Sequence, residues 1–214
     1  MARTELVRHP ARDKAVDRIY FKPWRGKKFR STRLLIVSES AYDWLEGGKR
    51  CTPLPIHPRA TVLENIKDPH VKYFSQLTRA LCGNGFPSVD DRRKAWSECA
   101  YTIFVQSAVG LGPGRPTHEQ FQEAGPPFLK LIERIRPWKV IVTGKDLWRN
   151  MPNTSAHHRG KLEAYRLRDG TLVWCLPLPH PANRTTGFNW RRVNKEIRWF
   201  KSLRLPRRNY AGKT

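Results

Sequence analysis

Short apolar runs alternate with helical patterns along this chain, and few folds accommodate that alternation. Three of the runs are typical of buried strands: 34–37 (Leu-Leu-Ile-Val), 101–105 and 138–143. Two further runs, 162–167 and 171–176, predict a β-hairpin or a pair of adjacent strands. Because helical patterns separate the strands, the sequence favours an α/β domain built on a largely parallel sheet.

Apolar residues at intervals of three and four predict the helices of this domain. The pattern over 62–81 is interrupted at Asp68-Pro69, since proline breaks a helix. Thr117 is expected to open the next long helix, and Gly144 precedes a short one. Residues 188–203 predict a basic helix at the end of the domain.

The charge of the chain is strongly positive and is concentrated at its two ends. Lys and Arg exceed Asp and Glu by 23; residues 1–33 hold 11 basic and 3 acidic residues, and residues 184–214 hold 10 and 1. Such an excess favours a polyanionic partner, with nucleic acid first. The sequence therefore divides into a basic N-terminal extension (1–33), one domain (34–203) and a basic C-terminal tail (204–214).

Other features of the composition exclude several classes of protein. Eight Trp, nine Phe and six Tyr supply a packed core, so this is not a disordered basic chain. The longest uncharged stretch, 99–114, has 16 residues, several of them Gly, Pro or polar, whereas a membrane span needs about 20 apolar ones. No secretory signal is recognisable at the N-terminus. We therefore expect a cytoplasmic, intracellular protein that acts as a monomer and does not engage a membrane.

The cysteine and histidine spacings do not predict a metal site. Cys51, Cys82, Cys99 and Cys175 form no C-x-x-C pair, which argues against a zinc ribbon and against a disulfide framework. The pair His157-His158 has no third ligand nearby and is expected in a solvated or phosphate-facing loop. The sequence implies no metal and no cofactor.

Ligands of parallel sheets bind beyond the carboxyl ends of the strands, so the residues that follow each strand are candidates for chemistry. Glu39 and Asp43 follow the first strand, where an apolar neighbourhood raises the pKa of a carboxyl group and suits it to acid–base work. Alternatively, Ser38, Ser40 or Asp43 caps a following helix. His180 stands between two prolines that fix its backbone.

Four ordered blocks of the sequence carry motifs: 34–42 (LLIVSESAY), 101–117 (ending Arg-Pro-Thr), 128–148 and 180–184 (HPANR). Together they resemble the uracil-DNA glycosylase superfamily. The first block resembles its Gly-Glu-x-Pro-Gly or Gly-x-Asp-Pro-Tyr motif, and the last its His-Pro-Ser or Asn-Pro-Ser motif followed by a wedge residue. The resemblance implies a three-layer α/β/α fold with a central, mostly parallel four-stranded sheet.

The same resemblance implies a DNA glycosylase, which flips a base out of DNA and hydrolyses its N-glycosidic bond. Glu39 is implied as the catalytic acidic residue that orients water and stabilises the sugar cation. His180 is implied as the hydrogen-bond donor to the departing base. The implied base-binding residues are Ser40, Tyr42, Phe104 and Gln106, and the implied DNA contacts are Arg184 as the wedge, Asn183, Lys145 and Arg115.

Departures from the motifs point away from plain uracil. Ser38 and Ala41 replace the Gly and Pro of the first motif, and Ser40 stands where several branches have Asp or Asn. Phe104 stands where many members keep an Asn that reads uracil, and Gln106 is the nearest amide. The expected substrate is therefore an altered base, with a bulky or hypermodified one as an option, in DNA repair or in defence against foreign modified DNA.

Two other functions stay open on the sequence alone. One is a catalytically inactive DNA-binding protein on the same fold, and the other is an RNA-binding or RNA-modifying protein. The expected partner is DNA, either a duplex with a flipped base or a single strand. Both basic ends are expected to flank Glu39 and His180 and to hold the duplex while Arg184 enters it.

Overall fold

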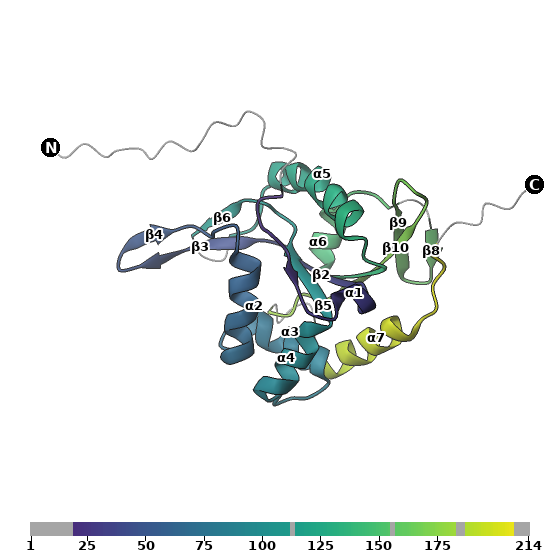
Figure 1. Ribbon diagram of the computed structural model, residues 1–214. Coiled ribbons are helices and arrows are strands. Elements are labelled where there is room, and N and C mark those ends of the chain that lie inside the picture. The colour runs from purple at the N-terminus through teal and green to yellow at the C-terminus, as the bar shows by residue number, and fades with distance from the viewer. Residues whose placement is uncertain (1–18, 112–113, 155–156, 183–186, 208–214) are drawn as a thin grey trace, which may run out of the picture.

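The computed structural model describes residues 19–111, 114–154, 157–182 and 187–207, and a seven-stranded sheet of order β1-β5-β2-β7-β10-β9-β8 forms its centre (Figure 1). The strands are β1 (Trp24–Arg25), β2 (Leu34–Ser38), β5 (Cys99–Ile103), β7 (Lys139–Thr143), β8 (His157–Arg159), β9 (Leu162–Arg166) and β10 (Leu172–Leu178). The inner strands β5, β2, β7 and β10 are parallel, and β1, β9 and β8 join antiparallel. The predicted four-stranded parallel core is confirmed, and antiparallel strands extend it on both sides.

Helices cover both faces of this sheet (Figure 1). One face carries α2 (His57–Lys67), α3 (Lys72–Cys82), α4 (Val89–Ser97) and α7 (Trp190–Ser202), and the other carries α1 (Phe29–Thr32), α5 (His118–Ile135) and α6 (Lys145–Asn150). Along β2, Leu34 and Ile36 enter the first core while Leu35 and Val37 enter the second, as alternate side chains of a strand do. The expected three-layer α/β/α architecture is confirmed.

The helix boundaries follow the local signals in the sequence. Asp68-Pro69 lies between α2 and α3, and Thr117 caps α5 by accepting a hydrogen bond from the Gln120 N–H at 3.3 Å. Gly144, with a φ of 141°, precedes α6. Strands β9 and β10 pair antiparallel, so the hairpin predicted over 162–176 is confirmed.

The segment that follows β2 departs from expectation. Instead of a loop, it forms the hairpin of β3 (Ala41–Glu46) and β4 (Lys49–Cys51), which projects from the body at the left of Figure 1. Gly47 and Gly48 turn the chain with positive φ, and β6 (Ala108–Leu111) pairs parallel to β3. No helix begins here, so the interpretation of Ser38, Ser40 or Asp43 as a helix cap is wrong. At the start of β3, Ala41 and Asp43 are buried while Tyr42 and Trp44 are exposed. This alternation with a period of two is typical of a strand and not of a helix.

Residues on both sides of the predicted domain bounds also pack on the sheet. Phe21 is completely buried, β1 pairs with β5, and the Trp138 N–H donates to the Arg33 carbonyl at 2.8 Å. At the other end, the Leu172 N–H donates to the Arg207 carbonyl at 2.8 Å. These contacts add residues 19–33 and 204–207 to the packed structure.

Arg92 joins α4 to the end of α2, which predicts a large stability effect. The side chain is 8% exposed, and its guanidinium donates to the carbonyls of Ile66, Lys67 and Pro87 at 2.8, 3.0 and 2.7 Å. We expect Arg92→Met to lower the free energy of unfolding by about 2–4 kcal/mol, because three carbonyls lose a charged donor. Urea denaturation measures this loss.

Arg93→Met is the matched control, since Arg93 is exposed and, among the residues that the structure describes, its one ion pair is with the exposed Asp90 one turn away. Such a surface pair contributes at most about 0.5 kcal/mol. Equal losses in the two variants would contradict a structural role for Arg92.

Candidate active site

The four parallel strands end together, and two of the predicted site residues follow directly. Ser38 pairs with Ile103 and Leu178 with Thr143, so the ends of β2, β5, β7 and β10 lie at one edge of the sheet. The ladder continues past β2, because the Val105 N–H donates to the Glu39 carbonyl at 2.9 Å. The backbone of Glu39 is therefore held by the sheet itself.

Glu39 is a largely buried carboxylate beside one cation. Its side chain is 12% exposed, and Oε2 lies 3.4 Å from Nη2 of Arg115. Burial raises the pKa of Glu39 above its usual value, and the charge of Arg115 opposes that rise. Arg115 also lies 3.2 Å from the carboxylate of Asp146, which divides its charge between two partners. The result is a carboxylate of increased basicity.

His180 is half-buried at the end of β10 and is presented as a neutral ring. The Ala182 N–H donates to Nδ1 at 3.3 Å, so the proton of the neutral imidazole lies on Nε2. Burial lowers the pKa of His180, and the charge of Arg115 lowers it further. At neutral pH the ring is therefore an uncharged donor of a hydrogen bond.

Tyr73, on α3, belongs to the same site, although the sequence did not point to it. Its ring lies 5.4 Å from the His180 ring, centroid to centroid, and its hydroxyl lies 2.6 Å from the Thr143 hydroxyl. Because the Thr143 hydroxyl donates to the Val37 carbonyl at 2.8 Å, it accepts from Tyr73. Burial raises the pKa of Tyr73 well above its usual value, and the charge of Glu39 adds to the rise. In the sequence, Tyr73 is one residue of an apolar helical pattern, and that pattern does not predict contact with the site.

Tyr73 and Arg115 together place Glu39 and His180 in one site. Tyr73 contacts the His180 ring and is close enough to Glu39 for the carboxylate to act on its hydroxyl. Arg115 pairs with Glu39, and its charge reaches the His180 ring. The site thus includes, besides the residues that follow the strands, Tyr73 from α3 and Arg115 from the segment before α5.

Two of the predicted base-binding side chains serve the fold instead. Phe104 is 1% exposed and packs against Phe121 and Phe128, which leaves its ring no surface for a base. The amide of Gln106 accepts from the Phe21 N–H at 3.0 Å and donates to the Ile103 carbonyl at 2.6 Å. Strand β5 ends at Ile103, so Phe104 and Gln106 both follow the strand, where contacts with α5 and with Phe21 decide the position of their side chains.

The other predicted contacts occupy different positions. Tyr42 is 39% exposed on β3, and the Ser40 hydroxyl is buried without a hydrogen-bond partner among the described residues. Lys145 is exposed at the start of α6. Arg115, predicted to contact DNA, lies against Glu39. Asn183 and Arg184 lie outside the described residues.

The part of the basic N-terminal extension from residue 24 to residue 33 lies at the end of the sheet opposite to Glu39 and His180. The Gly26 and Lys28 N–H groups donate to the carbonyls of Cys99 and Ser97, where β5 begins. Residues 24–33 therefore lie opposite the strand ends that carry Glu39 and His180, so the expectation that the basic N-terminal extension flanks this site is wrong for these residues, while residues 1–18 lie outside the described ranges. The edge where the parallel strands begin and the edge where they end are separated by the full length of a strand.

The described ranges contain no cluster of metal ligands and no candidate membrane span. Within them, no group of three His, Cys, Asp or Glu side chains could hold a metal ion. Within them, too, no helix has the length and apolar character to cross a membrane. His157 and His158 form part of β8, and the structure does not describe their side chains.

The similarity of the chain to known proteins identifies its family. No curated protein matches its sequence at a significant level. The family model of the uracil DNA glycosylase superfamily matches residues 10–204, which include the sheet, its helices and both strand ends that carry Glu39 and His180. Since that match spans most of the sequence, the chain belongs to the uracil-DNA glycosylase superfamily.

Proposed function

We propose that this protein is a monofunctional DNA glycosylase that flips an altered base out of DNA and hydrolyses its N-glycosidic bond, leaving an abasic site. Membership of the superfamily indicates DNA glycosylase activity in general. The observation that carries the finer proposal is that one edge of the sheet presents both Glu39, a largely buried carboxylate with a raised pKa, and the neutral ring of His180. Cleavage of this bond requires a negatively charged group that accepts a proton and a neutral group that donates a hydrogen bond. Glu39 and His180 have these two properties.

The bond from C1′ of the sugar to the base breaks with its electron pair going to the base. Positive charge then develops on the sugar and negative charge on the base. The Glu39 carboxylate stabilises the sugar cation and accepts a proton from the water whose oxygen bonds to C1′. The Nε2–H of His180 donates a hydrogen bond to the departing base, which then takes up a proton. An abasic sugar and a free base result.

The positions of several side chains favour a base other than uracil. Phe104 replaces the amide that reads uracil in many members, and the Gln106 amide is bonded to main-chain groups. The buried Ser40 hydroxyl, next to Glu39, is a polar group available to a substituted base. We propose an altered base, bulky or hypermodified, as the substrate, in DNA repair or in defence against foreign modified DNA.

In this proposal DNA is held by the wedge residue that the family motif implies, by its neighbour and by two exposed side chains. Arg184 enters the duplex as the wedge, Asn183 adjoins it, and Lys145 contacts phosphate from its exposed position. Tyr42, exposed on the hairpin that begins beside Glu39, contacts the flipped base. The protein acts as a monomer. Replacement of the motif Gly and Pro by Ser38 and Ala41 favours the second candidate, a catalytically inactive DNA-binding protein.

Replacement of Glu39 separates these two functions. We expect Glu39→Gln to lower the single-turnover excision rate about 100-fold or more, because acid–base groups of this kind contribute about that factor, while DNA affinity changes little. Duplexes with uracil, hypoxanthine, oxidised or hypermodified bases are incubated with the protein, and alkali then cleaves the abasic sites. Glu123→Gln, on the exposed face of α5, is the control and should keep full activity.

Strand scission by the wild-type protein on none of these substrates would sink the glycosylase proposal. DNA binding that persists in that case would identify the inactive binding protein. Preference for single-stranded RNA over DNA in competition would instead support a role on RNA.

Arg115 sets the pH dependence of excision. Its charge lowers the pKa of Glu39, so Arg115→Gln should raise that pKa and move the acid limb of the kcat/KM profile to higher pH. The pKa of His180 should rise in the same variant, because Arg115 also lowers it. NMR titration of the His180 ring measures this second shift independently.

Arg149→Gln is the matched control for that variant. Arg149 lies 3.0 Å from one carboxylate oxygen of Asp146, and Arg115 lies 3.2 Å from the other, but within the described ranges Arg149 forms no ion pair with Glu39. The acid limb should stay in place. A limb that moves equally in both variants, or toward lower pH in Arg115→Gln, would show that Arg115 does not act on Glu39.

A further inference from the structure

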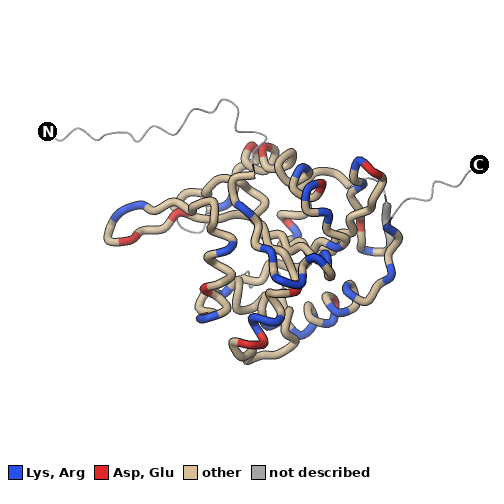
Figure 2. Tube along the Cα trace, viewed as in Figure 1, with Lys and Arg blue, Asp and Glu red and all other residues tan. Residues whose placement is uncertain are grey.

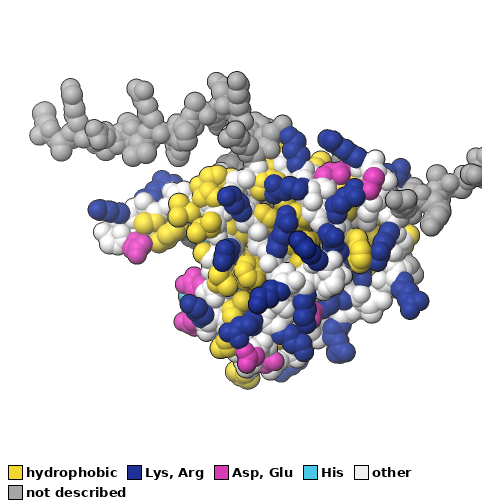
Figure 3. All heavy atoms as spheres, in the orientation of Figure 1, with side chains coloured by type: hydrophobic (Ala, Val, Ile, Leu, Met, Phe, Trp, Pro, Cys, Tyr) yellow, Lys and Arg dark blue, Asp and Glu magenta, His cyan; other side chains and the backbone are white. Residues whose placement is uncertain are grey.

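Four arginines gather at the edge where the parallel strands begin, opposite the active site. Arg25 comes from β1, Arg30 and Arg33 from α1 and its end, and Arg134 from the last turn of α5. Partial burial lowers the pKa of Arg25, and the charges of Arg134, Arg30 and Arg33 lower it further, so these three groups lie close enough to act on Arg25. We name this set the arginine edge. Figure 2 shows Lys and Arg positions along the segments that form β1 and α1, and Figure 3 shows Lys and Arg side chains gathered over the same face.

The arginine edge is not neutralised by carboxylates of the described chain. Within those ranges, Arg25, Arg30 and Arg134 form no ion pair. The nearby carboxylates have other partners: Glu98 pairs with Lys201 at 2.7 Å, and Asp169 with Arg136 at 2.7 Å. Clustered like charges destabilise a folded protein, so an arrangement without compensation indicates a partner of opposite charge.

One of the four arginines is fixed by the main chain. Arg33 donates from Nη1 to the Ile135 carbonyl and from Nε to the Arg30 carbonyl, both at 3.1 Å. Its own φ of 50° is in the left-handed region. Arg33 therefore organises the edge, while Arg25, Arg30 and Arg134 are exposed and free to meet a ligand.

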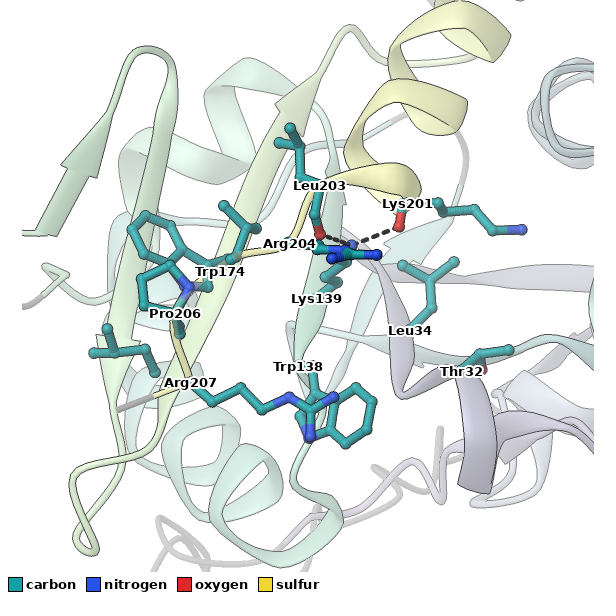
Figure 4. Close-up of a pocket in the computed structure, with 12 residues that line it drawn as sticks. Thr32, Leu34, Trp138, Lys139, Trp174, Lys201, Leu203, Arg204, Pro206 and Arg207 are labelled. Atoms are coloured by element: carbon teal, nitrogen blue, oxygen red, sulfur yellow. Dashed lines mark hydrogen bonds between the residues drawn. The ribbon is translucent and has the colours of Figure 1, made fainter. Parts of the chain in front are cut away.

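A cavity of about 550 Å³ continues the basic surface beyond Arg33 (Figure 4). Trp138, whose N–H donates to the Arg33 carbonyl, lines it together with Arg204 and Arg207. Residues 203–207 cross it as a strap, which Trp174 fastens by donating from its indole to the Pro206 carbonyl at 2.9 Å.

The aromatic side chains of this cavity are already covered. The guanidinium of Arg207 lies 3.5 Å from the centroid of the Trp138 ring, and Trp174 is 5% exposed. Single-stranded nucleic acids are held largely by stacking of bases on open aromatic faces, and the two tryptophans of this cavity are covered. Guanidinium groups without aromatic faces suit the phosphates of a duplex instead.

We propose that the arginine edge binds the phosphate backbone of a second segment of duplex DNA, separate from the segment that the active site reads. The protein then bridges two duplex segments, one at each end of its sheet. Contacts of this kind are independent of base sequence and weaken steeply with salt, because they release counterions from the DNA. A protein that holds one segment while reading another stays near DNA during its search.

The test uses the full chain and the triple variant Arg25→Gln/Arg30→Gln/Arg134→Gln, with Arg33 retained for its main-chain role. Two unmodified 20-base-pair duplexes carry a donor and an acceptor fluorophore, and energy transfer between them reports bridging. We expect transfer with the wild-type protein and none with the variant. The slope of log affinity against log salt should decrease by up to about 2.7, from roughly 0.9 for each lost phosphate contact.

The control variant is Arg59→Gln/Lys67→Gln/Lys94→Gln, which removes the same charge from exposed positions on α2 and α4. It should keep the bridging. Equal loss in both variants would reduce the effect to net charge and overturn the proposal. Absence of transfer with the wild-type protein, or displacement by single strands more readily than by duplex, would also overturn it.

The outcome is independent of the proposed chemistry, because the duplexes contain no altered base. On a short substrate duplex, the triple variant should excise within about twofold of the wild-type rate. Bridging without excision on any substrate would refute the glycosylase and leave the arginine edge intact. Excision without bridging would do the reverse.

Discussion

The burial of β2 between β5 and β7 is the constraint on which the rest of the structure depends. Leu35, Ile36 and Val37 are completely buried, so the strand cannot shift its register by one residue without exchanging its two apolar faces. That register fixes where the strand ends, and the ladder then extends one residue further to the carbonyl of Glu39. Packing of the apolar side chains of β2 therefore determines where the carboxylate of Glu39 lies.

The same burial sets the electrostatics of the site, and Arg115 adjusts them. Removal from water makes the charged form of Glu39 less stable and does the same to the charged form of His180. Arg115 favours the carboxylate but disfavours the imidazolium, so one cation supports the protonation states that the two groups need together. Asp146 shares Arg115 and limits how far it lowers the pKa of Glu39. The protonation of the site is thus a balance of burial against one shared charge.

The sequence predicted the strands well because buried parallel strands are continuous apolar runs, such as 34–37, that water-facing segments do not imitate. The hairpin at Ala41–Cys51 escaped because its exposed Tyr42, Trp44 and Leu45 do not form such a run. Tyr73 escaped because only the docking of α3 on the sheet brings it to His180. Local patterns thus predict helices and strands. The contacts of residues beyond a strand end, and the edge of the sheet at which a charged segment lies, depend instead on residues distant in sequence.

The two edges of the sheet separate charges that would otherwise interfere. An uncompensated arginine cluster beside Glu39 would lower the pKa of that carboxyl and offset the effect of its burial. The five residues of β2 span roughly 17 Å at about 3.3 Å per residue, which exceeds the Debye length of about 8 Å at physiological salt. The arginine edge can therefore be strongly positive with little effect on Glu39. A chain with a net charge of +23 reconciles attraction to DNA with a basic carboxylate by placing the two at opposite ends of one buried strand.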